Sequence, residues 1–216
     1  GTHDCIPKLL DSFEEQQEFY LVQELIDGES LGDEIRRAGR LSEAQVIVLL
    51  QETLGILKFV HDNRVIHRDL KPDNLIRRKH DYRLCLIDFG AVKEIRTQLA
   101  NSELTSLTVG VGTQGYTPSE QLAGKPRWSS DIFALGMTAI HGLTGRPPTD
   151  LPEDMASLES RWEEYANVSL GLRYVLKKMV RHYFYQRYQS VTDVLYDLGR
   201  LDELAKKAER LTMAET

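Results

Sequence analysis

The stretch SSDIFALGMTAIHGLTG, residues 129–145, constrains the fold more than any other part of the chain. It is apolar on nearly every side of a helix, and a helix of that kind must be buried. Gly145 and Pro147 end it. Other elements must therefore surround this helix, and the 216 residues, 41% of them hydrophobic, are enough to bury a core.

Periodicity predicts the elements around the central helix. Ser42 and Gln45 form a capping box before a helix that ends near Asn63, with one apolar face. A shorter helix is expected over 31–38, ending at Gly39, and amphipathic patterns return near 169–183 and 191–211. Two apolar runs, 6–13 and 19–26, predict a β-hairpin. Short extended pieces follow at 64–67, 74–78 and 83–89.

Composition excludes several classes of protein. The sequence contains no run of 18 apolar residues, so no membrane helix is predicted. No leader with a charged part followed by an apolar part is visible. The net charge is −6 and the basic residues are spread out, so neither nucleic acid nor an anionic membrane surface is the expected partner. Cys5 and Cys85 are expected to be buried thiols rather than a disulfide. A cytoplasmic location is therefore expected.

The stretch VIHRDLKPDNLI, residues 65–76, carries the chemistry. It holds Asp69, Lys71 and Asn74, and Asp88 follows at the end of a short strand pattern. Phosphoryl transfer needs a carboxylate that orients the attacking hydroxyl, oxygen ligands for Mg²⁺, and a cation for developing charge. These four residues supply that set.

The motifs as a group resemble the protein kinase family. They are HRDLKPDN (67–74), DFG (88–90), GTQGYTPSEQ (112–121), SSDIFALGMTAIHGLTGRPP (129–148) and QRYQS (186–190). The sequences of these motifs are most similar to those of bacterial serine/threonine kinases, particularly cyanobacterial ones. The resemblance implies an α+β, mainly α fold. Residues 1–26 would be a remnant of the small lobe, 27–201 the large lobe, and 202–216 a C-terminal helix or tail.

The resemblance also implies roles in catalysis and nucleotide binding, with ATP and Mg²⁺ as cofactors. Asp69 would be the catalytic carboxylate, Lys71 would neutralise the transferred group, and Asn74 and Asp88 would bind Mg²⁺. Gln23 would face the nucleotide pocket, where apolar residues are commoner. The backbone of Glu24 and Ile26 would meet the adenine, Glu29 the ribose, and Ile76 the underside of the base.

Further roles are regulatory or structural. Arg68 would pair with a phosphate on the activation segment, where the acceptor candidates are Thr105, Ser106 and Thr108. Thr113 would bond to the pair of Asp69 and Lys71. The structural positions implied by the resemblance are His67, Phe89, Gly90, Glu120, Asp131 and Arg187.

Some residues have two interpretations. Asp131 is either a first-turn acid favoured by the helix dipole or a buried anchor for the catalytic loop. Glu120 and Arg187 are either surface charges or a buried pair, and the sequence PSE at 118–120 replaces the usual Ala-Pro-Glu. GVGTQG (110–115) matches a nucleotide-binding pattern but lacks the strand and helix around it. His61 and His182 have no ligands at metal spacing and are expected on the surface or at helix ends.

The chain shows no glycine-rich loop and no strand lysine before the expected hinge. Three interpretations stay open: a piece of a longer active kinase, a non-catalytic binding module, and a weak nucleotide binder that transfers no phosphate. On the first, the parent protein would phosphorylate serine or threonine of protein substrates, and the piece alone would have little activity. Its exposed strands would favour self-association.

Overall fold

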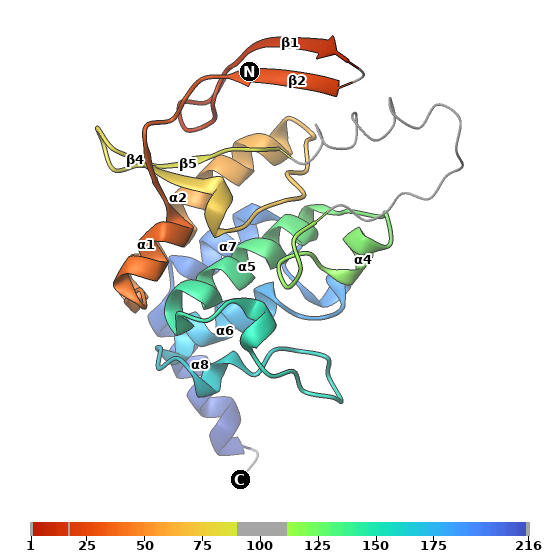
Figure 1. The fold of residues 1–216 in the computed structure, drawn as a ribbon. Coiled ribbons are helices and arrows are strands. Elements are labelled where there is room, and N and C mark those ends of the chain that lie inside the picture. The colour runs from red at the N-terminus through yellow and green to blue at the C-terminus, as the bar shows by residue number, and fades with distance from the viewer. Residues whose placement is uncertain (1, 17, 90–111, 215–216) are drawn as a thin grey trace.

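The computed structural model describes residues 2–16, 18–89 and 112–214 (Figure 1). A β-hairpin of β1 (Leu9–Glu15) and β2 (Glu18–Gln23) lies at one end of the molecule, and a mainly helical body lies below it. The fold is thus α+β and mainly α, as the sequence predicted. The helices are α1 (Leu31–Ala38), α2 (Glu43–Asp62), α4 (Ser119–Leu122), α5 (Trp128–Thr144), α6 (Leu170–Met179), α7 (Val191–Leu198) and α8 (Leu201–Ala214). Single turns of 3-10 helix are η1 (Pro72–Asn74), η2 (Pro148–Asp150), η3 (Trp162–Glu164) and η4 (Phe184–Gln186).

Helix α5 is the central element of the body. Of its residues, Ile132, Leu135, Ala139 and Ile140 are essentially inaccessible to solvent. Both α2 and α6 pack against it. The helix ends at Gly145, whose φ of 67° is the left-handed conformation that glycine adopts readily. The prediction of a buried central helix is confirmed.

Helix α2 begins with the predicted capping box between Ser42 and Gln45. Its predicted apolar face is buried in the core: Val46, Leu49, Leu50, Leu54 and Leu57. By length and composition α2 could also cross a membrane, but a core helix of a soluble protein passes the same test. The burial of this face against the rest of the body explains its apolar character without a membrane.

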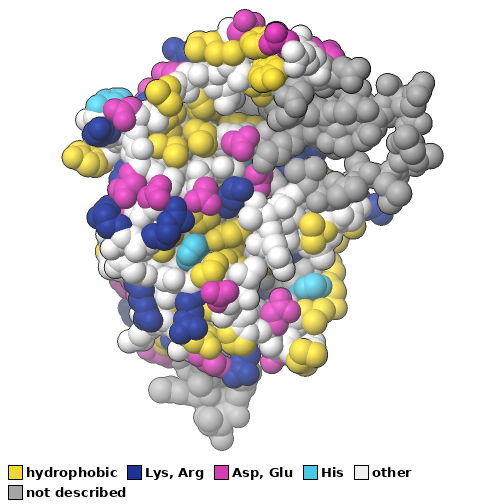
Figure 2. Space-filling model, in the orientation of Figure 1, with side chains coloured by type: hydrophobic (Ala, Val, Ile, Leu, Met, Phe, Trp, Pro, Cys, Tyr) yellow, Lys and Arg dark blue, Asp and Glu magenta, His cyan; other side chains and the backbone are white. Residues whose placement is uncertain are grey.

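The strands form two separate sheets, the hairpin of β1 and β2 and a three-stranded sheet. Strands β3 (Gly28–Ser30), β4 (Leu75–Arg78) and β5 (Leu84–Leu86) form an antiparallel sheet in that order. Gly28 is required there, because a Cβ would lie 2.2 Å from the Arg77 carbonyl oxygen. The hairpin pairs with no third strand among the residues that the structure describes. Its exposed apolar side chains, visible as a yellow cluster at the top of Figure 2, include Leu9, Leu10, Phe13, Tyr20 and Val22.

The C-terminal pattern at 191–211 forms two helices rather than one, because the chain turns at Gly199 and Arg200. Helix α8 packs against α6. At the contact, a Cβ on Gly171 would lie 2.2 Å from the Leu201 carbonyl oxygen. The segment expected as a helix or tail is therefore helical as far as Ala214, and it packs against the helical body at least as far as the buried Leu204.

The two cysteines are free and buried, as predicted. The backbone amide of Leu86 donates to the Cys5 carbonyl oxygen at 2.9 Å, so Cys5 lies beside strand β5, which carries Cys85. Burial, and to a smaller extent the neighbouring Cys5, raise the pKa of the Cys85 thiol to about 12. Such a thiol is protonated at neutral pH and has little nucleophilic character.

Two helical glycines give a matched test of this packing. Gly171→Ala should destabilise the protein by about 1–3 kcal/mol, because its methyl group would overlap the backbone of Leu201. Gly55→Ala should be neutral or stabilise by up to about 1 kcal/mol, because nothing lies within 4 Å and alanine favours a helix. Urea unfolding measures both. Equal effects of the two substitutions would contradict the close contact between α6 and α8.

Candidate active site

Asp131 anchors the loop that carries the catalytic motif. It lies in the first turn of α5 with its side chain 1% exposed. Its two carboxylate oxygens accept the backbone N–H groups of His67 at 2.9 Å and Arg68 at 3.0 Å. Arg68 has φ of 69°, which is unusual for a residue with a side chain. The geometry is that of the buried anchor rather than of a simple helix-end charge.

His61 also contacts this anchor, which the sequence did not indicate. It lies in the last turn of α2, as a helix-end residue, but its side chain is only 10% exposed. Its Nε2 lies 2.9 Å from Asp131 Oδ2, and its ring packs on Trp128 at 4.9 Å between centroids. The expectation of a surface or helix-end histidine therefore holds in its helix-end form. The contact with Asp131 could not be predicted, because the partner is 70 residues away and no local pattern reports such a contact.

His67 is a neutral imidazole whose tautomer is fixed by its two partners. Its Nε2 lies 3.0 Å from the Ile87 carbonyl oxygen, which can only accept, so Nε2 carries the proton. The backbone N–H of Asp69 donates to Nδ1 at 3.3 Å. Burial lowers the pKa of His67, in agreement with a neutral ring. His67 therefore joins the catalytic loop to the strand end that precedes Asp88.

Asp69, Thr113 and Lys71 form one connected group. The Thr113 hydroxyl donates to Asp69 Oδ1 at 2.9 Å and accepts from Lys71 Nζ at 3.0 Å. Lys71 Nζ also lies 3.7 Å from Asp69 Oδ2. Asp69 is 4% exposed, so the carboxylate is held in place by charge and hydrogen bonds at the floor of the site. The structure thus contains the contact that the resemblance implied for Thr113.

A backbone hydrogen bond links the segments that carry Asn74 and Asp88. The Asn74 side-chain amide donates to the Asp69 carbonyl at 2.7 Å and to Asp69 Oδ2 at 3.3 Å, which leaves Asn74 Oδ1 as the oxygen suited to a cation. The Ile87 N–H donates to the Asn74 carbonyl at 3.0 Å, so Asp88 follows one residue after this contact. Asp88 is exposed with φ of 59°. The donor set of one amide and one carboxylate oxygen fits Mg²⁺.

Phe89 packs on the catalytic loop from the strand side. Its ring lies 4.6 Å from the His67 ring between centroids. The candidates Gly90, Thr105, Ser106 and Thr108 lie outside the described residues. Arg68 is described, and its carbonyl oxygen accepts a hydrogen bond from the Gln121 side chain, another contact that the sequence did not indicate.

The residues assigned to the nucleotide lie along the hinge and the small sheet. Gln23 ends β2, and the Glu24 N–H donates to the Lys8 carbonyl at 2.9 Å, so only the Glu24 carbonyl remains for an adenine. Ile26 is partly buried against the core. Ile76 lies in β4, partly buried.

Glu29 is engaged within the protein itself. Its carboxylate accepts two hydrogen bonds from Arg37, at 3.1 and 2.9 Å, and this contact lowers its pKa. A ribose at this position would have to share or displace that contact.

Glu120 on α4 and Arg187, at the end of η4, form a buried pair. Arg187 binds both carboxylate oxygens, at 2.7 and 3.3 Å, and the two side chains are 1% and 8% exposed. Its other N–H groups reach the backbone carbonyls of Arg181, Ser129 and His182. All five donors of the guanidinium thus have acceptors. The interpretation as surface charges does not hold.

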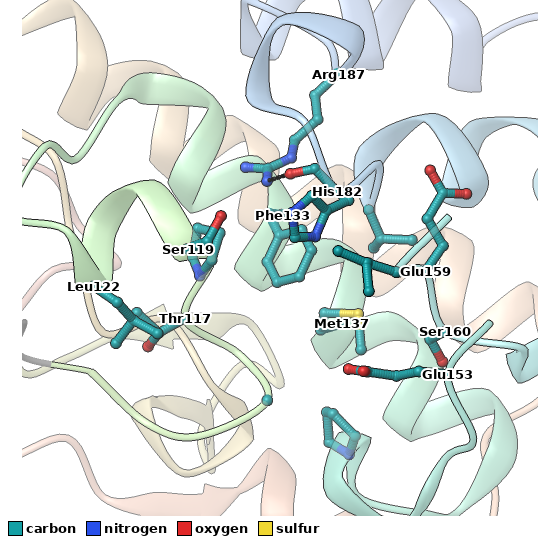
Figure 3. Close-up of a pocket in the computed structure, with 15 residues that line it drawn as sticks. Thr117, Ser119, Leu122, Phe133, Met137, Glu153, Glu159, Ser160, His182 and Arg187 are labelled. Carbon is teal, nitrogen blue, oxygen red and sulfur yellow. Dashed lines mark hydrogen bonds between the residues drawn. The ribbon is translucent and has the colours of Figure 1, made fainter. Parts of the chain in front are cut away.

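A cavity of about 230 Å³ opens beside this pair (Figure 3). In the figure Phe133 and Met137 from α5 lie between Arg187 and His182 on one side and Glu153 and Ser160 on the other. Gly115, Thr117 and Ser119 line its rim, so it adjoins the turn that carries Thr113. The cavity therefore lies under the segment that borders the catalytic group.

Removal of Arg187 tests the buried pair. Arg187→Ala should destabilise the protein by roughly 3 kcal/mol or more, because Glu120 would be left buried without its partner. Lys58→Ala, which removes an exposed pair with Asp62, should cost no more than about 0.5 kcal/mol. Denaturant unfolding measures both. A loss below about 0.5 kcal/mol for Arg187→Ala would place the pair in solvent.

The neutral state of His67 predicts a pH dependence of stability. The folded pKa lies below the ordinary value of 6.5, so below that pH the unfolded chain binds a proton that the folded protein does not. The free energy of unfolding should be highest above pH 6.5 and fall toward acid. In His67→Gln, measured by urea unfolding at pH 8 and pH 5, this fall should be smaller. An equal fall in both proteins would show that His67 does not contribute.

The comparisons with known proteins agree with this geometry. A family model described as protein kinase domain matches residues 1–213. Serine/threonine-protein kinase B of Synechocystis sp. is 43% identical over 90% of this chain and 35% of its own length. Serine/threonine-protein kinase PknA of Nostoc sp. is 41% identical over 88% and 34%. The chain thus spans about a third of these relatives.

The fold is also that of a solved kinase domain. The PknI kinase domain of Mycobacterium tuberculosis superposes with a TM-score of 0.72 at 22% identity, over 93% of this chain and 73% of that one. The predicted resemblance is confirmed: the chain belongs to the protein kinase family, and its cyanobacterial relatives are serine/threonine kinases.

Proposed function

We propose that the protein transfers the γ-phosphoryl group of Mg-ATP to serine or threonine hydroxyls of other proteins. The observation that carries this proposal is the connected group of Asp69, Thr113 and Lys71, with Asn74 bonded to Asp69 from the other side. A scaffold that only binds a partner has no need for a buried carboxylate paired with a lysine in this way. The serine/threonine-protein kinases of Synechocystis and Nostoc support it.

In this proposal each residue acts at a defined atom. The Asp69 carboxylate accepts the hydrogen bond of the attacking hydroxyl and orients it, which supplies positioning rather than covalent chemistry. Lys71, already 3.0 Å from the Thr113 hydroxyl, neutralises charge on the transferred group. Bound Mg²⁺ would supply charge neutralisation at the phosphates. Asn74 Oδ1 and the Asp88 carboxylate would hold it.

Nucleotide binding is proposed for the cleft side of the hinge. The Glu24 carbonyl and the backbone of Ile26 would meet the adenine, Ile76 would lie under the base, and Gln23 would face the pocket. Glu29 would contact the ribose only after its two bonds to Arg37 rearrange. This rearrangement is a specific reason to expect weak nucleotide affinity.

Regulation and location are further parts of the proposal. A phosphate on Thr105, Ser106 or Thr108 would pair with Arg68 and order the activation segment. The free buried thiols suit a reducing cytoplasm. The apolar side chains exposed on the hairpin suit self-association or another protein surface.

A second candidate is nucleotide binding without transfer. The observation that favours it is the contact of Glu29 with Arg37, because the residue proposed to meet the ribose is already engaged within the protein.

Radiolabelled ATP tests the proposal. The full gene product containing residues 1–216, incubated with Mg²⁺ and a serine- and threonine-containing protein, should transfer label to hydroxyl oxygens. Asp69→Asn should lower kcat by about 10³-fold or more, because the hydroxyl loses its orienting carboxylate. Asp62→Asn, at an exposed aspartate of α2, is the matched control.

Two outcomes would contradict the proposal. Equal rates of phosphoryl transfer by the wild type and Asp69→Asn would show that Asp69 takes no part in the transfer step. ATP binding measured by calorimetry, with no transfer by the wild type under any activating condition, would favour the second candidate.

A further inference from the structure

The turn 112–117 presents the Thr113 hydroxyl to Asp69 and Lys71. Its backbone closes on itself, because the N–H groups of Tyr116 and Thr117 both donate to the Thr113 carbonyl at 3.1 Å. Gly115 has φ of 83°, in the left-handed region. The position of the Thr113 side chain therefore depends on what holds this turn.

Tyr116 fastens the turn to helix α5. Its side chain is 8% exposed, and its hydroxyl lies 2.6 Å from Nδ1 of His141. Gly115 adds a second contact, because it approaches Pro148 so closely that a Cβ would lie 2.7 Å from that ring. The hydrogen bond of Tyr116 and the close approach of Gly115 to Pro148 thus join the turn to the segment formed by α5 and η2.

The hydrogen bond joins two neutral groups. Burial raises the pKa of the Tyr116 phenol and lowers the pKa of His141, so both are neutral near pH 7. A neutral phenol can donate or accept, so its hydroxyl pairs with Nδ1 in either tautomer of the His141 ring. Asp73 from η1, Arg36 from α1 and Asp150 from η2 act on His141 with opposing signs, and desolvation outweighs them.

We propose that His141 is a positioning residue for the catalytic group. It acts through Tyr116: Nδ1 of His141 on α5 fixes the Tyr116 hydroxyl, Tyr116 fixes the turn, and the turn fixes the Thr113 hydroxyl between Asp69 and Lys71. This role rests on the proposed phosphoryl transfer, but the positioning itself is a property of the structure. His141 is a polar residue near the end of a mainly apolar helix, and in the described part of the chain it contacts the turn that carries Thr113.

Four variants separate positioning from packing. His141→Phe keeps a ring but removes the Nδ1 partner, and His141→Asn places a side-chain amide where Nδ1 was. Tyr116→Phe removes the hydroxyl and keeps the ring. The double variant His141→Phe with Tyr116→Phe removes both, and His80→Phe is the exposed control.

Amide hydrogen exchange, followed by NMR, measures how stably the turn is held, and it does not depend on enzymatic activity. The amides of Tyr116 and Thr117 should exchange about tenfold faster in His141→Phe and in Tyr116→Phe. The double variant should be no worse than either single one, because the two groups form a single contact. His141→Asn should stay within about threefold of the wild type. Unchanged exchange in His141→Phe, or equal loss in His141→Asn, would overturn the proposal.

Kinetics of the full gene product gives a second readout that packing alone does not produce. His141→Phe should lower kcat by about tenfold and leave the KM for ATP unchanged, with kcat restored in His141→Asn. A change confined to the KM for ATP would overturn the role of His141 in positioning. If the wild type transfers no phosphate, the proposed function fails, while the exchange experiment still decides whether His141 holds the turn.

Discussion

The carboxylate of Asp131 accepts hydrogen bonds from the backbone of His67 and Arg68 in a site that is almost fully closed to water. A buried carboxylate is costly unless its oxygens are satisfied, so this contact fixes how the catalytic loop meets α5. The loop then has one conformation, with Arg68 at positive φ, and Asp69 faces the site. The apolar character of α5 is what makes the anchor rigid, because the helix is packed on all sides.

Helix α5 is linked to the Asp69 carboxylate from two directions. Asp131 acts on the loop that carries Asp69. In the proposed role of His141, about 15 Å further along the helix, the same element acts through Tyr116 on the turn that carries Thr113. The buried pair of Glu120 and Arg187 fixes the segment after this turn. The core of the protein and the candidate site are therefore parts of one packing arrangement rather than a scaffold with a site added to it.

The sequence predicted the elements that depend on local patterns. The capping box of α2, the end of α1 at Gly39 and the apolar α5 all follow from neighbouring residues, and the catalytic motif follows from its spacing. The contacts of His61 and His141 could not be predicted from local patterns. Each contact joins side chains more than 20 residues apart, on elements whose relative orientation periodicity alone does not give. The bond of Glu29 to Arg37 was missed for a different reason: the resemblance assigns Glu29 a ligand, and only coordinates show that it already has a partner.

Hydrogen exchange at the catalytic loop in Asp131→Asn tests the central claim most directly. Asparagine has the same shape but turns one acceptor into a donor, so one of the two loop amides would face an N–H group. The amides of His67 and Arg68 should then exchange roughly tenfold to a hundredfold faster, while the amides in the middle of α2 keep their protection. Unchanged protection at His67 and Arg68 would contradict the claim that this carboxylate organises the site.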